Sequence, residues 1–492
     1  MDNTATLPTA PAVEKRDIRF VLLTFVLCYA GCEWMLFGGW GAAVPLFALL
    51  FYGAAATWLR PSAQRLLNRQ SIPLLLAVMA LCIFCVAYDN SNLRAFNLCA
   101  LWGLSLLSLS AMAGTGHRPV WWMGTGLDIL GQTFIYPFKY ITRACVTLVS
   151  TAKDAKHGRA AARILLTLVI ISPLLALAIL LLTHADANFG WLLARIGQLF
   201  SDRFYQIISK LLLAALFTSP LFSLLFAVKY EKQPLTLHIN STPRGVLDGL
   251  TVSVALWAFS ILYLLYMLIQ GSYLFSAFRQ ALPEGFTYAS YARRGFFELL
   301  GICLLNFVLL FFTLLLTKKQ AQKLPRGANA AVWVFSLLTL LLIATAGSKM
   351  ALYVRQFGLT PLRVYTFWCM AAIGLAVVCI LIKLAMPTFA FFRFACVGVL
   401  LWYLLLNVAD VDARVADYNI ARYRATGSDL DTGLLFTLSD SAVPAIVTLK
   451  DDPIYGEKIR AALSFRETRQ TKWQNWTLSK AIADESLQKI GF

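Results

Sequence analysis

Charged residues are scarce in this chain and make up only 14% of its 492 residues. A soluble domain carries about 25% charged residues, so the composition argues against a soluble globular class. Hydrophobic residues account for 59% of the chain, and the mean hydropathy is +0.68. This balance is typical of a protein that lies largely within a membrane.

Catalytic and cofactor-binding motifs are also missing. The sequence has no phosphate-binding GxxxxGK, no HExxH and no credible GxSxG nucleophile turn. Its four histidines, His117, His157, His184 and His238, are scattered singly, which argues against a histidine metal cage. We therefore predict no catalytic residue, no cofactor-binding residue and no metal centre, and we favour a protein that is not an enzyme.

A disulfide framework is excluded by where the cysteines lie. All ten fall in or beside apolar stretches, and the hydrophilic tail after Val408 has none. Within lipid a lone cysteine usually packs as a small hydrophobic residue.

Long apolar runs are what the sequence does contain. A membrane-spanning helix needs about 20 apolar residues, because the hydrocarbon core is about 30 Å thick. The runs are continuous and not alternating, so helices are favoured over a barrel. We predict an all-α polytopic membrane protein with about eleven spans. They lie near 18–37, 41–58, 72–88, 95–113, 163–183, 209–228, 248–270, 296–317, 329–348, 365–386 and 388–408.

The charge distribution sets the predicted orientation. The tail from Val408 has 11 basic and 12 acidic residues, so the net charge of +18 belongs to the loops beside the membrane. Basic loops favour the cytoplasmic side of a membrane, and this preference explains the net positive charge without a nucleic-acid partner. A cytoplasmic N-terminus fits the bias better than the inverse, and an odd number of spans then places the C-terminus outside. One span more or fewer would return the tail to the cytoplasm.

Three regions follow from this reading. Residues 1–17 form a cytoplasmic tail, residues 18–408 the membrane domain, and residues 409–492 a small extracytoplasmic helical domain. Segments near 120–150 and 189–208 carry aromatic, basic and amphipathic patterns typical of helices at the membrane surface. In the tail, "VDARVADYNIARYRATG" predicts a helix that ends at Gly427.

Polar side chains inside the spans are costly at about 2.5–3.5 kcal/mol per charge at the bilayer centre, so each is a candidate for function. Glu33 and Asn306 are the two that we single out on this ground. Near the start of a later span, "YARRGFFELL" at 291–300 places Arg293, Arg294 and Glu298 beside an apolar run. The simple interpretation is that these groups reach the interface and pair locally.

The alternative interpretation is one polar cluster at the outer face. Arg293, Arg294 and Glu298 would meet the loop that carries Arg355 and Arg363, and the acidic start of the tail would supply partners for the arginines. The residues expected to form this cluster are Arg293, Arg294, Glu298, Arg355, Arg363, Asp410, Asp412 and Asp417.

Four stretches carry a resemblance to a known family. They are "YARRGFFELL", "FGLTPLRVYTFW" at 357–368, "DYNIARY" at 417–423 and "LSDSAVPAI" at 438–446. In this order they resemble the sibling bacterial domain-of-unknown-function families numbered 4173 and 4153, over roughly residues 240–450. The resemblance implies an integral protein of the bacterial inner membrane, and it implies no activity or catalytic residue.

Three functions remain open on the sequence. The first is a structural, scaffold or signalling component of the cell envelope, in contact with membrane lipids and with an envelope protein through its tail. The second is a transporter or channel that uses Glu33, Glu298 and Asn306. The third is a membrane enzyme that acts on lipid-linked substrates, against which the missing nucleophile–base signature counts.

Overall fold

The structure is a computed structural model. It describes residues 15–60, 66–114, 124–151, parts of 167–195, 202–231, 246–269, 296–318, 324–467 and 472–489. Over these residues the chain is helical and contains no strand. The all-α prediction is therefore confirmed for the part of the chain that is described.

Eight described helices are long and apolar enough to cross a membrane. They are α1 (Lys15–Gly31) with the π-helical turn η1 (Cys32–Leu36), α4 (Ser91–Ala113), α10 (Asp202–Tyr230), α11 (Gly249–Ile269), α14 (Phe296–Leu316), α15 (Arg326–Phe357), α16 (Pro361–Ala385) and α17 (Phe391–Val408). Two shorter apolar helices, α2 (Ala43–Leu59) and α3 (Ser71–Ala87), run among them. The span expected at 163–183 lies partly outside the described residues, and its described residues are helical.

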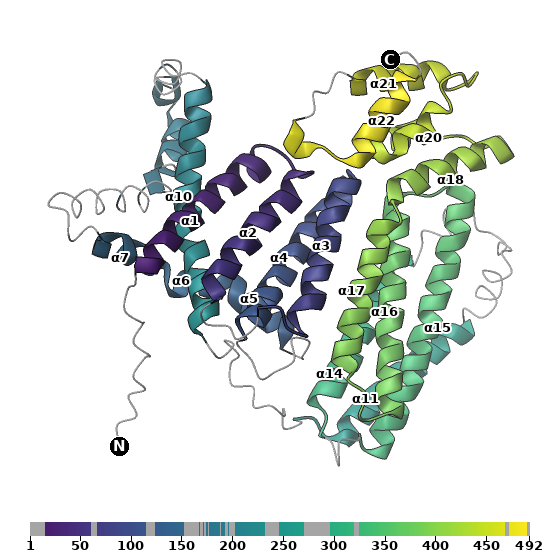
Figure 1. Ribbon diagram of the computed structural model, residues 1–492. Coiled ribbons are helices and arrows are strands. Elements are labelled where there is room, and N and C mark those ends of the chain that lie inside the picture. Colours follow the sequence, from purple (N-terminus) through teal and green to yellow (C-terminus); the bar gives the residue numbers. More distant parts are fainter. Residues whose placement is uncertain are drawn as a thin grey trace, which may run out of the picture.

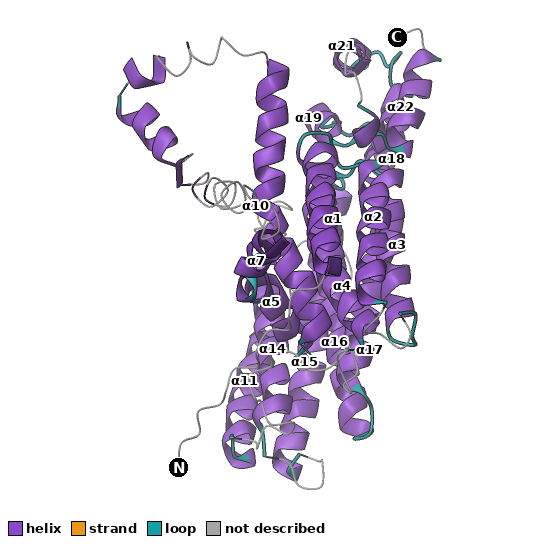
Figure 2. Cartoon of the chain, turned by 60° about the vertical axis from the view of Figure 1, so that its left-hand side comes forward, coloured by secondary structure: helices purple, strands orange, loops and turns teal. Residues whose placement is uncertain are grey.

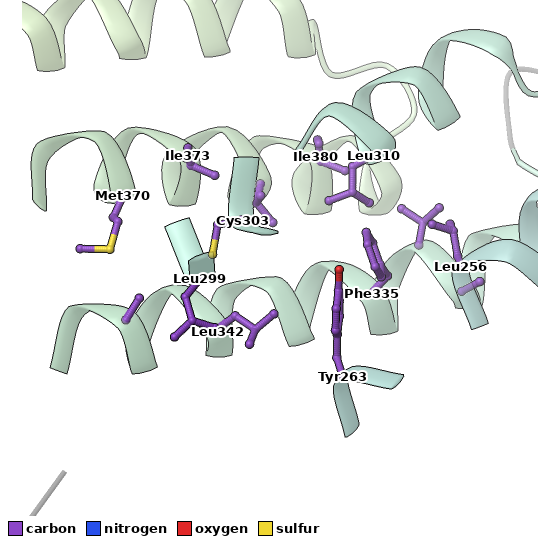
Figure 3. Close-up of a cluster of buried hydrophobic side chains, with 14 of the residues drawn as sticks. Leu256, Tyr263, Leu299, Cys303, Leu310, Phe335, Leu342, Met370, Ile373 and Ile380 are labelled. Carbon is purple, nitrogen blue, oxygen red and sulfur yellow. The ribbon is translucent and has the colours of Figure 1, made fainter. Parts of the chain in front are cut away.

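The membrane helices form two bundles that stand side by side (Figure 1). In the N-terminal bundle, Phe20 of α1 stacks on Trp58 of α2 at 4.1 Å between ring centroids, and both rings pack against Phe222 of α10. In the C-terminal bundle, α11, α14, α15 and α16 surround Phe335, which is fully buried. Figure 3 shows Tyr263 of α11 facing Phe335 within this second core.

The two segments that we expect at the membrane surface, near 120–150 and 189–208, form different structures. Part of the first forms three short helices, α5 (Thr125–Phe134), α6 (Tyr136–Lys139) and α7 (Ile141–Thr151). The second lies partly outside the described residues, and its described end, from Asp202, continues without a break into α10. A surface helix separate from the span is therefore not found over this end.

The tail forms a layer of short helices across one end of the membrane helices (Figures 1 and 2). It contains α18 (Val411–Thr426), α19 (Thr432–Thr437), η3 (Asp440–Ala442), α20 (Val443–Val447), α21 (Gly456–Glu467), η4 (Trp473–Asn475) and α22 (Leu478–Gln488). These helices share an apolar core that includes the fully buried Val415, Leu435 and Ile459. Helix α18 ends at Gly427, whose φ of 64° is the left-handed value expected of a C-cap glycine.

The tail also contacts the N-terminal bundle through the loop between η1 and α2. The Gly41 N–H donates to the carbonyl oxygen of Gln474 at 3.0 Å, and the Ala42 N–H donates to that of Trp476 at 3.0 Å. A Cβ atom on Gly41 would lie only 2.2 Å from the Trp476 carbonyl oxygen, so only glycine permits this approach. The tail thus contacts both bundles.

Candidate functional site

The arginines predicted to form an outer polar cluster are only partly visible. Arg293 and Arg294 lie outside the described residues. Glu298 lies in the first turn of α14 and is exposed, and none of the ion pairs among described residues includes it. The pairing of Arg294 with Glu298 therefore stays a prediction.

The other two parts of the expected cluster, the "GLTPLRVY" loop and the start of the tail, do meet. Asn419 of α18 accepts from the Leu359 N–H at 2.8 Å and donates through Nδ2 to the Leu359 carbonyl oxygen at 2.7 Å. Arg422, one turn later on α18, donates to the carbonyl oxygens of Arg355 at 3.2 Å and Gln356 at 2.6 Å. The contact is thus made by side chains of the tail with the backbone of the loop.

Arg363 also bonds to backbone carbonyl groups, and none of the ion pairs among the described residues includes it. Its guanidinium donates to the carbonyl oxygens of Phe357, at 3.3 Å, and Gly358, and it lies 4.2 Å from the centroid of the Tyr353 ring. The last carbonyl groups of a helix lack intrahelical donors and carry partial negative charge, so cations near them are favourable. The C-terminus of α15 therefore takes up two arginine side chains, Arg363 and Arg422.

The three tail acids differ in their surroundings. Asp417 is exposed on α18, and none of the ion pairs among described residues includes it. Asp412 is buried with 2% of its surface exposed, and it accepts from the Ser439 N–H at 3.2 Å. Asp410 immediately precedes α18 and has a positive φ of 44°. The structure therefore places Asp410 and Asp412 inside the tail junction, away from Arg363.

Both polar residues singled out within the spans have partners from other helices. Glu33 of η1 pairs with Lys210 of α10 at 2.5 Å. Asn306 of α14 is fully buried, accepts from the Tyr263 hydroxyl at 2.7 Å and donates to the Thr339 hydroxyl at 3.1 Å. These bonds connect helices within a bundle. Sequence reasoning did not find Lys210, which lies 177 residues from Glu33.

An apolar groove separates the two bundles. It has a cavity volume of about 920 Å³ and lies between α4 on one side and α14, α16 and α17 on the other. Aromatic and small aliphatic residues line it, among them Phe96, Ala100, Gly103, Phe307, Phe311, Trp368, Ala376, Phe391, Phe392 and Leu400. Phe96 is 66% exposed, so the groove is open at its side. Since its walls are membrane-spanning helices, the groove lies at the depth of the lipid acyl chains.

Amide side chains join the two bundles at the tail end of this groove. Asn97 of α4 donates to the Oδ1 atom of Asn407 of α17 at 2.8 Å, and both residues are buried. The Tyr403 hydroxyl donates to the Oδ1 atom of Asn97 at 2.5 Å. Buried interhelical hydrogen bonds of this kind hold helices together where lipid offers no alternative partner. We expect them to fix the spacing of α4 and α17 at this end.

A cluster of charged residues lies just beyond these amides. Asp89, in the loop between α3 and α4, pairs with Arg94 of α4 and with Lys480 of α22 at 3.3 Å. Asn90 of the same loop donates to the Tyr365 hydroxyl at 3.2 Å. A small polar pocket of about 20 Å³ lies here and is lined by Asn90, Arg94, Asn97, Asn407 and Asp410, among others. Leu93 lines both this pocket and the groove, so these polar groups lie next to the tail end of an apolar groove.

Disulfide bonds, and metal sites built from three or more His, Cys, Asp or Glu side chains, are not found among the described residues. The ten cysteines are free. The groove itself offers an apolar surface of a kind that suits acyl chains and other apolar groups.

Comparisons with known proteins give a family and no activity. Residues 74–449 match the family model described as "Domain of unknown function (DUF4153)". No curated protein and no solved structure matches the chain. Of the two sibling families that the four motifs resemble, the match is to DUF4153, and it extends well into the N-terminal half. Because the model covers more than half of the chain, the protein belongs to the DUF4153 family.

Proposed function

We propose that this chain is a structural component of the bacterial cell envelope that binds a membrane phospholipid in the groove between its two bundles. The observation that carries the proposal is the apolar groove of about 920 Å³ with polar groups at its tail end. This volume is at the upper end of the range of about 300–1,000 Å³ for small-molecule sites. A phospholipid is the occupant that we favour, because lipids are what surrounds an open groove at this depth.

Packing and polar contacts would both contribute to the affinity. Lipid tails are as apolar as the groove wall, so specific binding here depends on van der Waals fit to the aromatic lining and not on the hydrophobic effect. The headgroup would add hydrogen bonds and charge contacts near Asn90, Arg94 and Asp89. A lipid headgroup carrying both charges suits a site that contains both Arg94 and Asp89.

Transport of a polar solute receives less support. The transport hypothesis relied on Glu33, Glu298 and Asn306. Glu33 is bonded to Lys210, and Asn306 is bonded to Tyr263 and Thr339 inside the C-terminal bundle. Residues along an aqueous path would instead present their polar atoms to a water-filled cavity.

The third hypothesis, an enzyme acting on lipid-linked substrates, would use the same groove. Its polar end carries amides, phenols and the Asp89–Arg94 ion pair. We favour binding because these groups do not form a nucleophile with an adjacent base. The envelope-protein partner that we predict for the tail stays a prediction.

We further propose eleven spans, a cytoplasmic N-terminus and an extracytoplasmic tail in the inner membrane. Eight helices of sufficient length and the apolar α2 and α3 support ten of these spans, and the helical described residues of 163–183 support the eleventh. The excess of basic residues in the loops supports the orientation. Alkaline phosphatase, which is active only outside, and green fluorescent protein, which fluoresces only inside, can be fused in turn after Phe492. Phosphatase activity without fluorescence is expected, and the reverse would overturn the orientation.

Lipid binding can be tested with a matched pair of glycine variants. Gly103 lines the groove, and a Cβ atom there would meet only Ile129 at 3.8 Å, so Gly103→Leu would extend a side chain into the groove. Gly53 on α2 has no neighbouring atom within 4 Å of an added Cβ, and Gly53→Leu is the control. The probe is a phosphatidylethanolamine with a photoactivatable acyl chain, in nanodiscs.

We expect the wild type and Gly53→Leu to crosslink to the probe at groove residues such as Phe96 and Phe311. Gly103→Leu should lose these crosslinks while it keeps those on the outer surfaces of the bundles. Equal crosslinking of the two variants at Phe96 and Phe311, or crosslinks spread evenly over all lipid-facing helices, would overturn the proposal.

A further inference from the structure

Four oxygen-bearing side chains meet where the last membrane helix turns into the tail. Asp410 and Asp412 flank the first residue of α18, and Ser439 and Ser441 belong to the η3 turn that packs against α18. A hydrogen bond of 3.2 Å from the Ser439 N–H to the Oδ2 atom of Asp412 fixes the two segments relative to each other. The four side chains therefore come from two segments that are nearly thirty residues apart in the chain.

Asp412 is a buried carboxylate with one unused oxygen. It is 2% exposed, and its Oδ1 atom has no hydrogen-bond partner. A carboxylate that is removed from water needs a compensating charge or donor, because its ionised form is otherwise strongly disfavoured. Something that is positively charged or donates hydrogen bonds is therefore expected at the Oδ1 atom of Asp412.

Asp410 carries a second unused oxygen. It occupies the N-cap position of α18, where the Ala413 N–H of the first turn and the Ser441 hydroxyl face its carboxyl group. Its Oδ1 atom is buried without a partner.

The two serine hydroxyls complete the set. The Oγ atoms of Ser439 and Ser441 are buried and also lack partners. Of the nearby cations, Arg94 pairs with Asp89 and Arg466 pairs with Asp440 at 3.5 Å, whereas Arg414 acts on Asp410 through its charge and is in none of the ion pairs among the described residues. Burial raises the pKa of Asp410 and the charge of Asp412 adds to this, while the Ser441 hydroxyl, the Ala413 N–H and the charge of Arg414 act in the opposite direction without cancelling it. A positive charge between the two carboxylates would relieve both effects.

We propose that a hard divalent cation, calcium or magnesium, binds between Asp410 and Asp412 with the hydroxyls of Ser439 and Ser441. Carboxylate and hydroxyl oxygens together with water are the ligands that these ions prefer. Two carboxylates balance the charge of one divalent ion. The ion joins the start of α18 to η3 and so holds the tail at the end of the membrane helices. This inference is independent of lipid binding in the groove.

The test uses the full-length protein, purified in detergent and stripped with a chelator. Calcium, magnesium and terbium are added in turn, terbium because its luminescence reports calcium sites directly. Thermal unfolding is followed for the wild type, Asp410→Asn, Asp412→Asn and the control Asp417→Asn. Asp417 is an exposed acid on the same helix, so its substitution removes the same charge without touching the site.

We expect calcium or magnesium to raise the Tm of the wild type and of Asp417→Asn in a saturable way, with one terbium ion per chain. Asp410→Asn and Asp412→Asn should lose both responses. Without cation, Asp412→Asn should unfold at or above the wild-type Tm, because it no longer carries an uncompensated charge. If either variant fails to fold, Ser441→Ala, which keeps both charges, should fold and bind terbium more weakly.

Two results would overturn the proposal. In the first, the Tm of the wild type is the same in chelator as in millimolar calcium and magnesium, and no terbium site is detected. Arg94 and Lys480 would then balance the charges of Asp410 and Asp412 from a distance. The other is a cation response that Asp412→Asn and Ser441→Ala retain in full, which would place the ion elsewhere.

Discussion

Asn419 makes both of its amide hydrogen bonds to a single residue, Leu359, at 2.8 Å to the N–H and 2.7 Å to the carbonyl oxygen. The side chain thus acts as a short piece of backbone that pairs with the loop between α15 and α16. Two of the family motifs, "FGLTPLRVY" and "DYNIARY", meet at this pair. Their joint occurrence in the sequence therefore has a structural reason, which is attachment of the tail to the membrane domain.

Substitution of Asn419 by alanine should weaken that attachment. Asn419 is 8% exposed, so removal of its amide leaves two backbone groups of Leu359 without partners in a part-buried place. A loss of about 1–3 kcal/mol in the free energy of unfolding is expected. Thermal unfolding in detergent measures it, with the exposed Asp417→Ala as the control. Equal stability of the two variants would contradict the role assigned to Asn419.

Gly358 should be intolerant of any side chain. Its φ of 78° is a value that other residues rarely adopt, and a Cβ atom would lie 2.4 Å from the Oδ1 atom of Asn419. Gly358→Ala should therefore cost more than about 1 kcal/mol. Gly347 in the same helix has open space around an added Cβ, so Gly347→Ala should leave the Tm unchanged or slightly raised. A Tm for Gly358→Ala equal to that of Gly347→Ala would show that the loop adjusts freely.

The positions of the spans could be read from the sequence because bilayer thickness sets their length. The span predicted at 365–386 corresponds to α16 at Pro361–Ala385, and the span predicted at 388–408 corresponds to α17 at Phe391–Val408. The span expected at 329–348 is longer, since α15 continues to Phe357. Arg422 of the tail caps this extension, and hydropathy carries no information on such a contact.

The partners of polar residues could not be read in the same way. The sequence identified Glu33 and Asn306 as groups that need partners, because charge and polarity are costly in lipid. It could not identify Lys210, because which helices become neighbours is decided by packing. For Arg363 we expected a carboxylate partner, but its guanidinium bonds to backbone carbonyl groups at the end of α15. Such carbonyl groups accept hydrogen bonds whatever the side chains are, so the sequence does not mark them as partners.

Acidic pH should loosen the tail through Asp452. Burial opposes ionisation of Asp452, but the N–H groups of Tyr455 and Ile454, the Tyr423 hydroxyl and the charge of Arg424 outweigh it and hold its pKa below the usual range. An unfolded aspartate has a pKa of about 3.9. The ionised form therefore contributes stability above that pH, and the contribution is lost as the pH falls through the lower folded-state pKa.

We expect the Tm of the wild type to fall more steeply than that of Asp452→Asn between about pH 5 and the acid limit of the assay. Asp451→Asn is the matched control, because Asp451 is exposed and, within the described part of the chain, its carboxylate makes only ion pairs at 3.7 Å and 3.9 Å. It should keep the wild-type slope. Parallel pH profiles for the wild type and Asp452→Asn would show that Asp452 does not contribute.

The final prediction separates a structural role of Asn306 from a role in transport. Asn306 is fully buried between the Tyr263 hydroxyl and Thr339, which ties α11, α14 and α15 together. Hydrogen bonds between membrane helices contribute about 0.6 kcal/mol on average and up to about 1.7 kcal/mol. Asn306→Leu should thus lower the stability by a similar amount, and by less in a Tyr263→Phe background, where the bond is already absent.

Labelling gives the complementary measurement. In a variant that carries Asn306→Cys as its only cysteine, a membrane-impermeant maleimide should not react, because position 306 faces the packed core and not water. A residue on a transport path would be labelled, and Asn306→Leu would then leave the stability almost unchanged. Fast labelling together with a silent Asn306→Leu would favour the transport hypothesis over the packing role that the Tyr263–Asn306–Thr339 bonds support.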